Sequence, residues 1–189
     1  MADPVTANTH DNVSNAKKFD ELHRLIDGID IAILTTRAED GQLNSRPMAT
    51  QSRSSGADIW FMTSGETNKV SEIGANADVN VSYVNAGSRE WVSISGTATL
   101  NQDPAKIREL YKIDWKAWFE DLGGSRNGGP ADPRIMLINV RAHHVTYFKL
   151  NEPRPIVLFK IARAALTKSV PIVGDMRHLE PEDLTDLSS

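Results

Sequence analysis

Several features are missing from this sequence of 189 residues. It contains no cysteine, which excludes a disulfide framework, a thiolate metal site and a thiol nucleophile. No segment reaches the length of about 18 consecutive apolar residues that a membrane-spanning helix needs, so we expect no membrane partner. The net charge of −4 and the pI near 5.7 lack the basic excess of a general nucleic-acid binder. The polar residues 1–14 lack the apolar stretch of a signal peptide, which predicts a cytoplasmic protein.

Common catalytic and nucleotide-binding motifs are also missing. The sequence has no Gly-x-Ser-x-Gly, no Gly-x-x-x-x-Gly-Lys and no Gly-x-Gly-x-x-Gly, which argues against a nucleophile elbow, a P-loop and a dinucleotide fingerprint. His143 and His144 are adjacent on an expected strand, so their side chains should point to opposite faces of a sheet. We therefore predict no metal site, and packing is the simpler role for both residues.

Apolar residues make up 40% of the chain, an ordinary value for a globular domain. Short β-branched and apolar segments separated by turn residues indicate strands, and we expect six of them, at residues 31–36, 43–51, 58–63, 79–83, 91–100 and 135–149. Amphipathic patterns and capping residues indicate helices near residues 14–28, 67–74, 104–111, 115–119 and 156–169. Strands linked mostly by tight turns favour an antiparallel barrel. We predict a disordered segment at 1–13, one domain over 14–170 and a tail at 171–189.

The segment from Ile59 to Lys69 has the pattern of an anion site. An apolar strand ends in Thr63 and Ser64, and a helix follows with Thr67 as its expected cap and Lys69 in its first turn. Helix N-termini present free N–H groups to anions, and the hydroxyls and the ammonium group could add hydrogen bonds to a phosphate. A capped helix with a solvated lysine explains the same residues, and composition alone favours that simpler interpretation.

The strand at 43–51 offers a second charged candidate. Alternation places Arg46, Met48 and Thr50 on one face and Ser45, Pro47 and Ala49 on the other. Pro47 removes a ladder donor, which predicts an edge or an irregularity. Arg46 could reach a phosphate from this strand, but taken alone a surface arginine beside an edge proline is the better interpretation.

Together these segments resemble a known family. Over about residues 15–170 the chain resembles the pyridoxamine 5′-phosphate oxidase-like split barrels, and within them the general stress protein 26 branch. The matching segments are Ser45–Met48, Trp60–Ser64 with Lys69, Val92–Ala98, Lys116–Phe119, Val145–Phe148 and Leu158–Leu166.

The resemblance implies a mainly β (α+β) fold, a six-stranded antiparallel split β-barrel with flanking helices. It also implies a homodimer that binds FMN at the subunit interface. The implied cofactor-binding residues are Arg46 near the phosphate or ribityl chain; Pro47, Met48, Ala49 and Thr50 beside the ring; Thr63, Ser64 and Lys69 at the phosphate; Trp91 from the partner subunit; and Trp118 as a cover.

Two departures from the family pattern limit what the resemblance implies. Asn68 stands where the oxidase often has an arginine, so we expect weaker phosphate binding. Arg154-Pro155 and Arg177-His178 do not align with the oxidase's substrate motif, so we do not expect oxidation of pyridoxamine phosphate. The substrate and the electron donor remain open.

Three functions fit these observations. The first is an FMN-dependent general stress oxidoreductase, in which the flavin carries the electrons. The second is a non-catalytic flavin-binding stress protein that acts as a sensor, store or scavenger. The third is a split barrel that uses F420 or haem, with His143 or His144 as the axial ligand. FAD is a further alternative to FMN. The glycine-rich segment 123–129 could be a lid that offers Arg126 to a substrate, or an ordinary flexible connection.

Overall fold

The computed structural model describes residues 8–53, 57–167 and 169–185. No helix within these ranges has the length and apolar character needed to cross a membrane. The elements in chain order are α1 (Asn15–Asp27), β1 (Ile31–Arg37), β2 (Leu43–Arg53), β3 (Ile59–Ser64), α2 (Asn68–Ala75), β4 (Asp78–Val84), β5 (Trp91–Asn101), α3 (Pro104–Leu110), the 3₁₀ helix η2 (Ile113–Trp118), β6 (Ile135–Leu150), α4 (Arg154–Thr167), β7 (Gly174–Leu179) and α5 (Pro181–Thr185).

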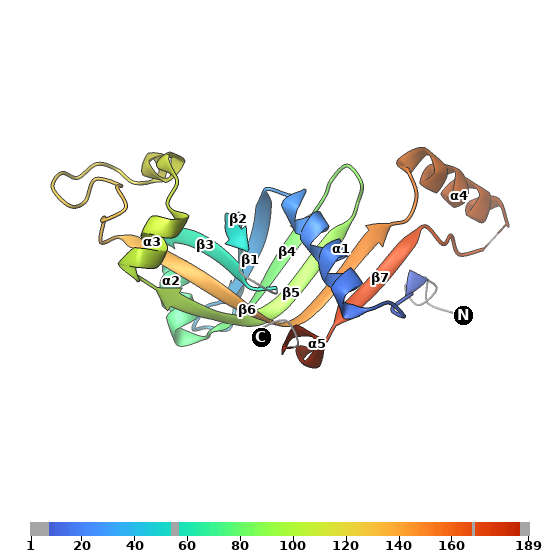
Figure 1. Ribbon diagram of the computed structural model, residues 1–189, viewed down its shortest axis with the longest axis horizontal. Helices are drawn as coiled ribbons and strands as arrows, with labels where there is room; N and C mark the ends of the chain where they lie inside the picture. The colour runs from blue at the N-terminus through green and yellow to red at the C-terminus, as the bar shows by residue number, and fades with distance from the viewer. Residues whose placement is uncertain (1–7, 54–56, 168, 186–189) are drawn as a thin grey trace.

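Six strands form the antiparallel barrel that the sequence predicts. Their order is β3-β2-β1-β4-β5-β6, and pairing between β3 and β6 closes the barrel. The first part of β6, residues 135–140, pairs with β3, whereas residues 145–150 pair with β7. Strand β6 therefore leaves the barrel halfway along its length and carries β7 outside it, as Figure 1 shows.

Helix α1 packs its apolar face against the barrel. Its buried residues include Phe19, Leu22 and Ile26, and Leu22 is completely buried. Burial of each such side chain contributes about 1.5–3 kcal/mol. Ser14 caps the helix by accepting a hydrogen bond from the backbone N–H of Lys17. The predicted helix is confirmed with its expected cap.

A second apolar cluster lies outside the barrel. It joins α3, η2 and the first residues of β6 through Ile107, Leu110, Trp115, Phe119, Ile135 and Leu137. Asp103 caps α3 through the backbone N–H of Ala105, and Pro104 follows it. This cluster fixes η2 beside β2 and β3, where a cavity forms.

The two chain ends differ from the sequence expectation. The expected tail contains β7 and α5, and residues 8–13, expected as disordered, pack beside β7. The Asn8 amide donates to the carbonyl of Pro171 and accepts from the backbone N–H of Val173, and Thr9 bridges to Met176. These partners lie more than 160 residues apart in the sequence, so local patterns do not indicate them. Residues 1–7 and 186–189 lie outside the described ranges.

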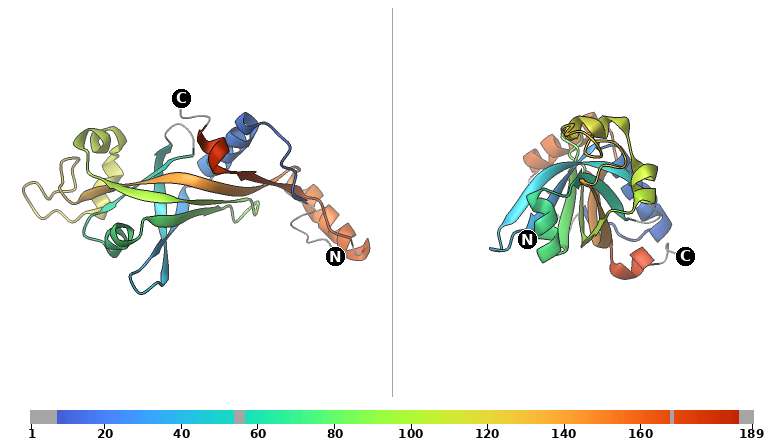
Figure 2. Two further views of the ribbon diagram at one scale, coloured as in Figure 1. Left: turned by 90° about the horizontal axis from the view of Figure 1, so that it is seen from below. Right: turned by 90° about the vertical axis from the view of Figure 1, so that its left-hand side faces the viewer.

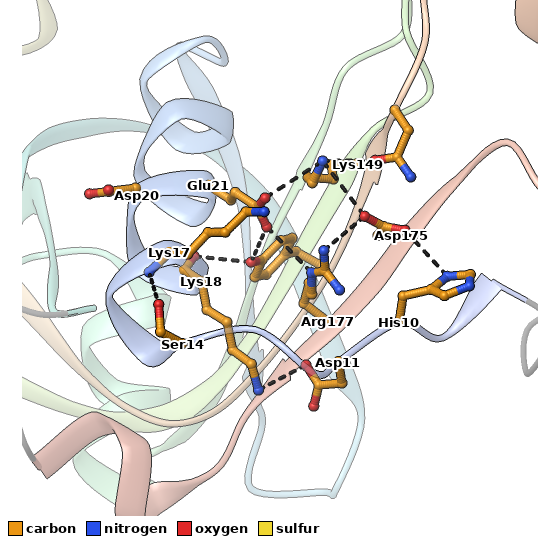
Figure 3. Close-up of polar contacts among 12 residues, drawn as sticks. His10, Asp11, Ser14, Lys17, Lys18, Asp20, Glu21, Lys149, Asp175 and Arg177 are labelled. Atoms are coloured by element: carbon orange, nitrogen blue, oxygen red, sulfur yellow. Dashed lines mark hydrogen bonds and ion pairs between the residues drawn. The ribbon is translucent and has the colours of Figure 1, made fainter.

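A charge cluster of Glu21, Lys149, Asp175 and Arg177 ties α1 to β6 and β7 (Figure 3). The Arg177 guanidinium lies 2.8 Å from the Asp175 carboxylate and 3.4 Å from that of Glu21. Lys149 Nζ lies 3.6 Å from Glu21 and 3.8 Å from Asp175. The Tyr147 hydroxyl donates to Glu21, and burial together with the Glu21 charge raises the pKa of that phenol. The charges in this cluster compensate one another.

Candidate functional site

A cavity of about 500 Å³ lies between the barrel wall and η2. Its size falls within the range of about 300–1,000 Å³ that is typical of small-molecule sites. Sixteen residues line it: Ile31, Pro47–Gln51, Met62–Ser64, Thr67, Lys69, Lys112, Asp114, Trp115, Trp118 and Phe119. Hollows of about 540 and 440 Å³ occur beside residues 150–154 and beside α4, but each is bordered by only eight residues and combines no hydroxyl cluster with aromatic walls.

One end of this cavity is cationic and rich in hydroxyl groups. Strand β3 ends there and α2 begins, which brings Thr63, Thr67 and Lys69 together. Lys69 Nζ lies 2.9 Å from Thr63 Oγ1 and 3.3 Å from Thr67 Oγ1. Thr67 is the N-cap residue of α2, but its side chain makes no capping bond within the helix and donates instead to the carbonyl of Ser64. The N-terminus of α2 therefore lies at the same end of the cavity as the ammonium group, and the first N–H groups of a helix are the ones without partners inside it.

Lys69 is a partly desolvated cation. Burial lowers the pKa of Lys69, the nearby positive charge of Arg46 lowers it further, and Glu72 partly opposes both effects. Within the described ranges Lys69 Nζ bonds to hydroxyl oxygens, and no carboxylate lies within ion-pair distance of it. Bound anions favour the charged form of a neighbouring amine, so this end of the cavity is suited to an anion.

The rest of the cavity has apolar and aromatic walls. Met48 is buried on β2, and Trp115 and Phe119 are buried on the opposite side. The indole N–H of Trp115 donates to the Gln51 side chain at 3.0 Å, which fixes the ring against β2. Trp118 lies at the rim and is 83% exposed. Trp115 is therefore packed into the wall of the cavity, whereas Trp118 faces solvent and leaves one side of the cavity open.

The structure brings together eight of the ten cofactor-binding residues that the resemblance implies. Pro47, Met48, Ala49, Thr50, Thr63, Ser64, Lys69 and Trp118 all line the cavity. The alternation predicted for β2 holds, since Met48 is buried while Pro47 and Ala49 are exposed. Arg46 and Trp91 are the two residues that do not line it.

Arg46 contacts other protein groups. Its guanidinium donates to Thr36 Oγ1 at 2.7 Å and to the Glu72 carboxylate at 2.8 Å. Arg46 is not among the residues that line the cavity, which differs from the expectation that it lies near the phosphate. Burial by itself would raise the pKa of Glu72, but hydrogen bonds from Thr36, Arg46 and Asn44 and the charge of Arg46 bring it below its ordinary value. Arg46 thus attaches α2 to β1 and β2 and positions the helix that carries Lys69.

Trp91 lies far from the cavity within its own chain. It is the first residue of β5 and pairs with Phe148 near the end of β6, whereas the cavity adjoins the β3 end of the barrel.

The two adjacent histidines differ from the prediction. A β-bulge between Ser95 and Gly96 shifts the register of β5 and β6, and a Cβ at Gly96 would overlap the carbonyl oxygen of Arg141. Around the bulge Ala142 and Val145 are buried, so His143 and His144 both lie on the outer side. The prediction of opposite faces is therefore wrong. Neither histidine lines the cavity, and no group of metal-ligating side chains occurs in the described part of the chain.

The glycine-rich segment 123–129 is held at several points. Arg126 forms an ion pair of 2.6 Å with Glu66, and the Tyr111 hydroxyl donates to the carbonyl of Gly128. The buried pair of Asp132 and Arg134 anchors its far end, and the hydrogen bond from Arg134 holds the pKa of Asp132 well below its ordinary value. Arg126 contacts Glu66 and is not among the residues that line the cavity.

Sequence reasoning omitted several cavity residues from the implied set. Gln51 continues the β2 segment, and Met62 precedes the Thr63-Ser64 pair. Asp114 lies in η2, and Lys112 and Phe119 flank that helix. The aromatic pattern of residues 115–119 did indicate a packed helix, but which strand it would cover depends on the second apolar cluster.

A closed six-stranded split barrel with a cationic, hydroxyl-lined pocket beside its β3–α2 junction defines the structural class. The family model described as pyridoxamine 5′-phosphate oxidase like matches residues 17–171, and the chain belongs to this family. Protein bli-3 of Neurospora crassa is 32% identical, over 97% of this chain and 90% of that protein.

Two solved structures support this assignment. The general stress FMN/FAD binding protein of Xanthomonas citri is 29% identical with a TM-score of 0.58, over 72% of this chain and 92% of that one. The General Stress Protein 26 of Bacillus anthracis has a TM-score of 0.59 at 18% identity, over 69% of this chain and 92% of that one, and shows the same fold.

Proposed function

We propose that the protein binds FMN in this cavity, with the phosphate at Lys69 and the ring between β2 and η2. The observation that carries the proposal is the partly desolvated Lys69 ammonium group, which contacts two threonine hydroxyls at one end of an apolar-walled cavity. FMN joins a planar aromatic ring to a charged phosphate, so the two ends of the cavity match the two ends of the ligand. The Xanthomonas citri relative, described as an FMN/FAD binding protein, points to the same class of ligand.

Each part of the site has a distinct task in this proposal. Thr63, Ser64, Thr67 and Lys69 would hold the phosphate by charge-assisted hydrogen bonds. The β2 residues Pro47–Thr50 would lie along the ring, and Trp115 would support its other side. The Arg46–Glu72 pair acts at a distance, because it fixes α2 and therefore the position of Lys69.

We also propose that the protein is a homodimer with the cavity at the subunit interface. Trp118 leaves the rim of the cavity open to solvent, and Trp91 lies at the opposite end of the barrel from its own cavity. A second copy related by a twofold axis would bring its Trp91 end to this cavity, and the reciprocal contact would form at the other site.

We further propose that the bound flavin makes the protein a general stress oxidoreductase. Bound FMN would supply reversible electron transfer, which the protein need only bind, orient and shield. The charged residues lining the cavity, within the described ranges, are Lys69, Lys112 and Asp114. Reduction of bound FMN by NADH or NADPH, followed by turnover with an acceptor, would support the enzyme; bound FMN without turnover would favour the non-catalytic alternative.

Phosphate recognition can be tested with two flavins. The wild-type protein should bind FMN more tightly than riboflavin, which lacks the phosphate, as measured by flavin fluorescence titration. Lys69→Met should weaken FMN binding about tenfold or more, the cost of one charged hydrogen-bond partner, and should leave riboflavin binding unchanged.

The matched control is Lys17→Met, because Lys17 is an exposed lysine on α1 and its replacement should change neither affinity. Equal losses for both flavins in Lys69→Met would contradict the phosphate assignment. Binding of F420 or haem in the absence of flavin binding would overturn FMN as the cofactor.

A further inference from the structure

Helix α4 exposes apolar side chains to solvent. Val157 and Ala164 are buried and face the protein. At 3.6 residues per turn Phe159 and Leu166 lie on the opposite side of the helix, where they are 68% and 86% exposed. Ala162 is exposed on the same side, and we call these three residues the outer stripe. A surface helix normally presents polar residues on this side, so the outer stripe is suited to contact with an apolar phase.

A hollow of about 440 Å³ lies beside the same helix. It is bordered by four residues of α4, among them Lys160 and Arg163, and by residues 169–172. The hydroxyl oxygens of Thr167 and Ser169, which both border it, lie 2.8 Å apart. None of the eight bordering residues is acidic. Two cations and two hydroxyl groups around one hollow are suited to a phosphate group.

The positive charge of α4 is only partly compensated. The helix carries Arg154, Lys160 and Arg163 and no acidic residue, although the whole chain has a net charge of −4. Lys160 Nζ lies 3.0 Å from the Glu152 carboxylate, and within the described ranges this is the one ion pair that a cation of α4 makes. Helix α4 therefore concentrates positive charge in an acidic protein.

The outer stripe and the hollow lie side by side on the helix. At about 100° per residue, Arg163 lies about 40° around the helix from Phe159 and about 60° from Lys160 in the other direction. Arg163 therefore stands at the border between the apolar stripe and the cationic hollow. An anionic phospholipid has the same two parts in contact, because glycerol joins its headgroup phosphate to its acyl chains.

Helix α4 is placed to meet an extended surface along its side. Figures 1 and 2 show it at one end of an elongated molecule, with the α3–η2 region beside the cavity at the other end. Its 14 residues measure about 21 Å at about 1.5 Å per residue, less than the roughly 30 Å of a bilayer's hydrocarbon core. Helices with Phe and Leu beside Lys and Arg lie in the plane of the headgroups. Such a helix needs no spanning segment, whose absence was the basis for expecting no membrane partner.

We propose that α4 binds the surface of a membrane that contains anionic phospholipids. Phe159 and Leu166 enter the boundary between headgroups and acyl chains, and Lys160 and Arg163 hold a headgroup phosphate in the hollow together with its two hydroxyl groups. The proposal goes beyond flavin binding and does not rest on it, since the hollow shares no residue with the cavity.

Vesicle flotation tests the proposal on the full chain. The wild type should float with vesicles of equal parts phosphatidylcholine and phosphatidylserine, and it should not float with phosphatidylcholine alone. Binding should weaken as salt is added, because screening reduces the attraction of the cations to anionic headgroups. Failure to float with the phosphatidylserine vesicles would overturn the proposal, and so would equal flotation with both kinds of vesicle.

The role of the cations is tested with Arg163→Gln. The variant should bind phosphatidylserine vesicles about fivefold more weakly, the usual effect of one basic residue near an anionic surface, as measured by vesicle titration. Arg108→Gln is the matched control, because Arg108 is an exposed helical arginine on α3, and its affinity should equal that of the wild type. Equal losses in the two variants would show attraction without a site on α4 and would overturn the proposal.

The role of the outer stripe is tested with Phe159→Ser/Leu166→Ser. The double variant should bind the same vesicles about tenfold or more weakly, because two apolar side chains no longer leave water. The matched control is Leu43→Ser/Val84→Ser, at two apolar residues that are 64% and 63% exposed outside α4. A loss no larger than that of the control would contradict insertion of the stripe.

Insertion can also be observed directly, since the chain has no cysteine. A polarity-sensitive fluorophore attached to Leu166→Cys should shift its emission to shorter wavelengths when phosphatidylserine vesicles are added. The same fluorophore on Lys17→Cys, at an exposed residue of α1, should show no shift. Equal shifts at both positions, or no shift at Leu166→Cys, would overturn the proposal.

Further measurements identify other occupants of this surface. If the wild type does not float and Phe159→Ser/Leu166→Ser loses self-association in sedimentation equilibrium, the stripe contacts a second copy and the proposal is wrong. A wild type that binds inorganic phosphate in the hollow but does not float would likewise replace the lipid with a free anion. Flotation without FMN binding would refute the proposed function alone, and FMN binding without flotation would refute the lipid contact alone.

Discussion

Two groups of charged residues in this protein differ in how their charges are compensated. In the charge cluster of Glu21, Lys149, Asp175 and Arg177, each cation lies within ion-pair distance of a carboxylate. At the cavity, Lys69 contacts hydroxyl groups, and within the described ranges no carboxylate forms an ion pair with it. Both groups remove charge from water, but only the first provides its own counter-charge.

The difference separates a structural role from a binding role. A buried charge that lacks a partner is costly, so a compensated cluster stabilises the fold only while it is complete. An uncompensated cation weakens the fold slightly and is stabilised when an anionic ligand arrives. The comparison therefore predicts opposite effects of removing a cation in the two regions.

The largest effect is expected from Arg177→Met. Arg177 is 3% exposed, and its removal leaves two buried carboxylates without their main cation. Breaking a buried pair in this way typically costs about 3–5 kcal/mol, which urea unfolding would measure. FMN affinity of the folded protein should not change. An affinity loss as large as that of Lys69→Met would contradict the separation of the two regions.

A smaller loss is expected from Glu72→Gln, because Glu72 accepts hydrogen bonds from Thr36, Asn44 and Arg46. Hydrogen bonds to a charged group contribute about 1.5–3 kcal/mol. The folded pKa of Glu72 lies below its ordinary value of 4.5, so its contribution is complete above that value and is lost as the pH falls through the folded pKa.

Unfolding experiments at a series of pH values can test this dependence. The difference in unfolding free energy between wild type and Glu72→Gln should shrink as the solution is acidified below pH 4.5. A difference that stays constant, or grows, would show that the Glu72 charge is not what holds α2. The same variant should weaken FMN binding, since α2 carries Lys69.

Lys69→Met is expected to change stability little, within about 0.5 kcal/mol, or to increase it, when no flavin is present. Its lowered pKa also predicts that FMN affinity falls in the wild type as the pH rises through that pKa, because the charged form is lost. The variant should show no such decline between neutral and alkaline pH. A strong destabilisation of the flavin-free variant would show that Lys69 has a structural role, like the cations of the charge cluster.

The smallest effect is expected from Arg126→Gln. Its ion pair with Glu66 is short, but both side chains are substantially exposed, and exposed pairs contribute about 0–1 kcal/mol. Thermal unfolding at low and high salt would measure the loss, which should vanish at high salt because exposed charges are screened. A larger loss of stability that persists at high salt would show that the Arg126–Glu66 contact of segment 123–129 stabilises the fold as the charge cluster does.

Much of the fold could be predicted from local patterns. Alternation along β1, β2 and β4, the Ser14 cap of α1 and the Asp103-Pro104 start of α3 each depend on neighbouring residues alone. Strand β7 could not be predicted in this way, since its sequence is polar and charged. It forms because the second half of β6 leaves the barrel and offers an unpaired edge.

The candidate site was predictable to a similar degree. Thr63, Ser64 and Lys69 occur together at a strand–helix junction. This local pattern was compatible with an anion site, although composition alone favoured a capped helix with a solvated lysine, and the family resemblance was what favoured a phosphate. Arg46 was misplaced because its partner, Glu72, lies 26 residues away on α2. The histidines were misplaced because a bulge opposite Gly96 changes the alternation, and a strand pattern alone does not indicate where a bulge will form.

The sequence by itself determined the strand and helix periods, the capping residues and the junction that carries Lys69, because each depends on interactions between near neighbours. Only the tertiary structure decided which charges are compensated, which side chains share the cavity and which apolar surfaces remain uncovered. These properties depend on contacts between residues distant in the chain. Within the described ranges no carboxylate forms an ion pair with Lys69, and this tertiary property distinguishes the proposed phosphate site from an ordinary capped helix.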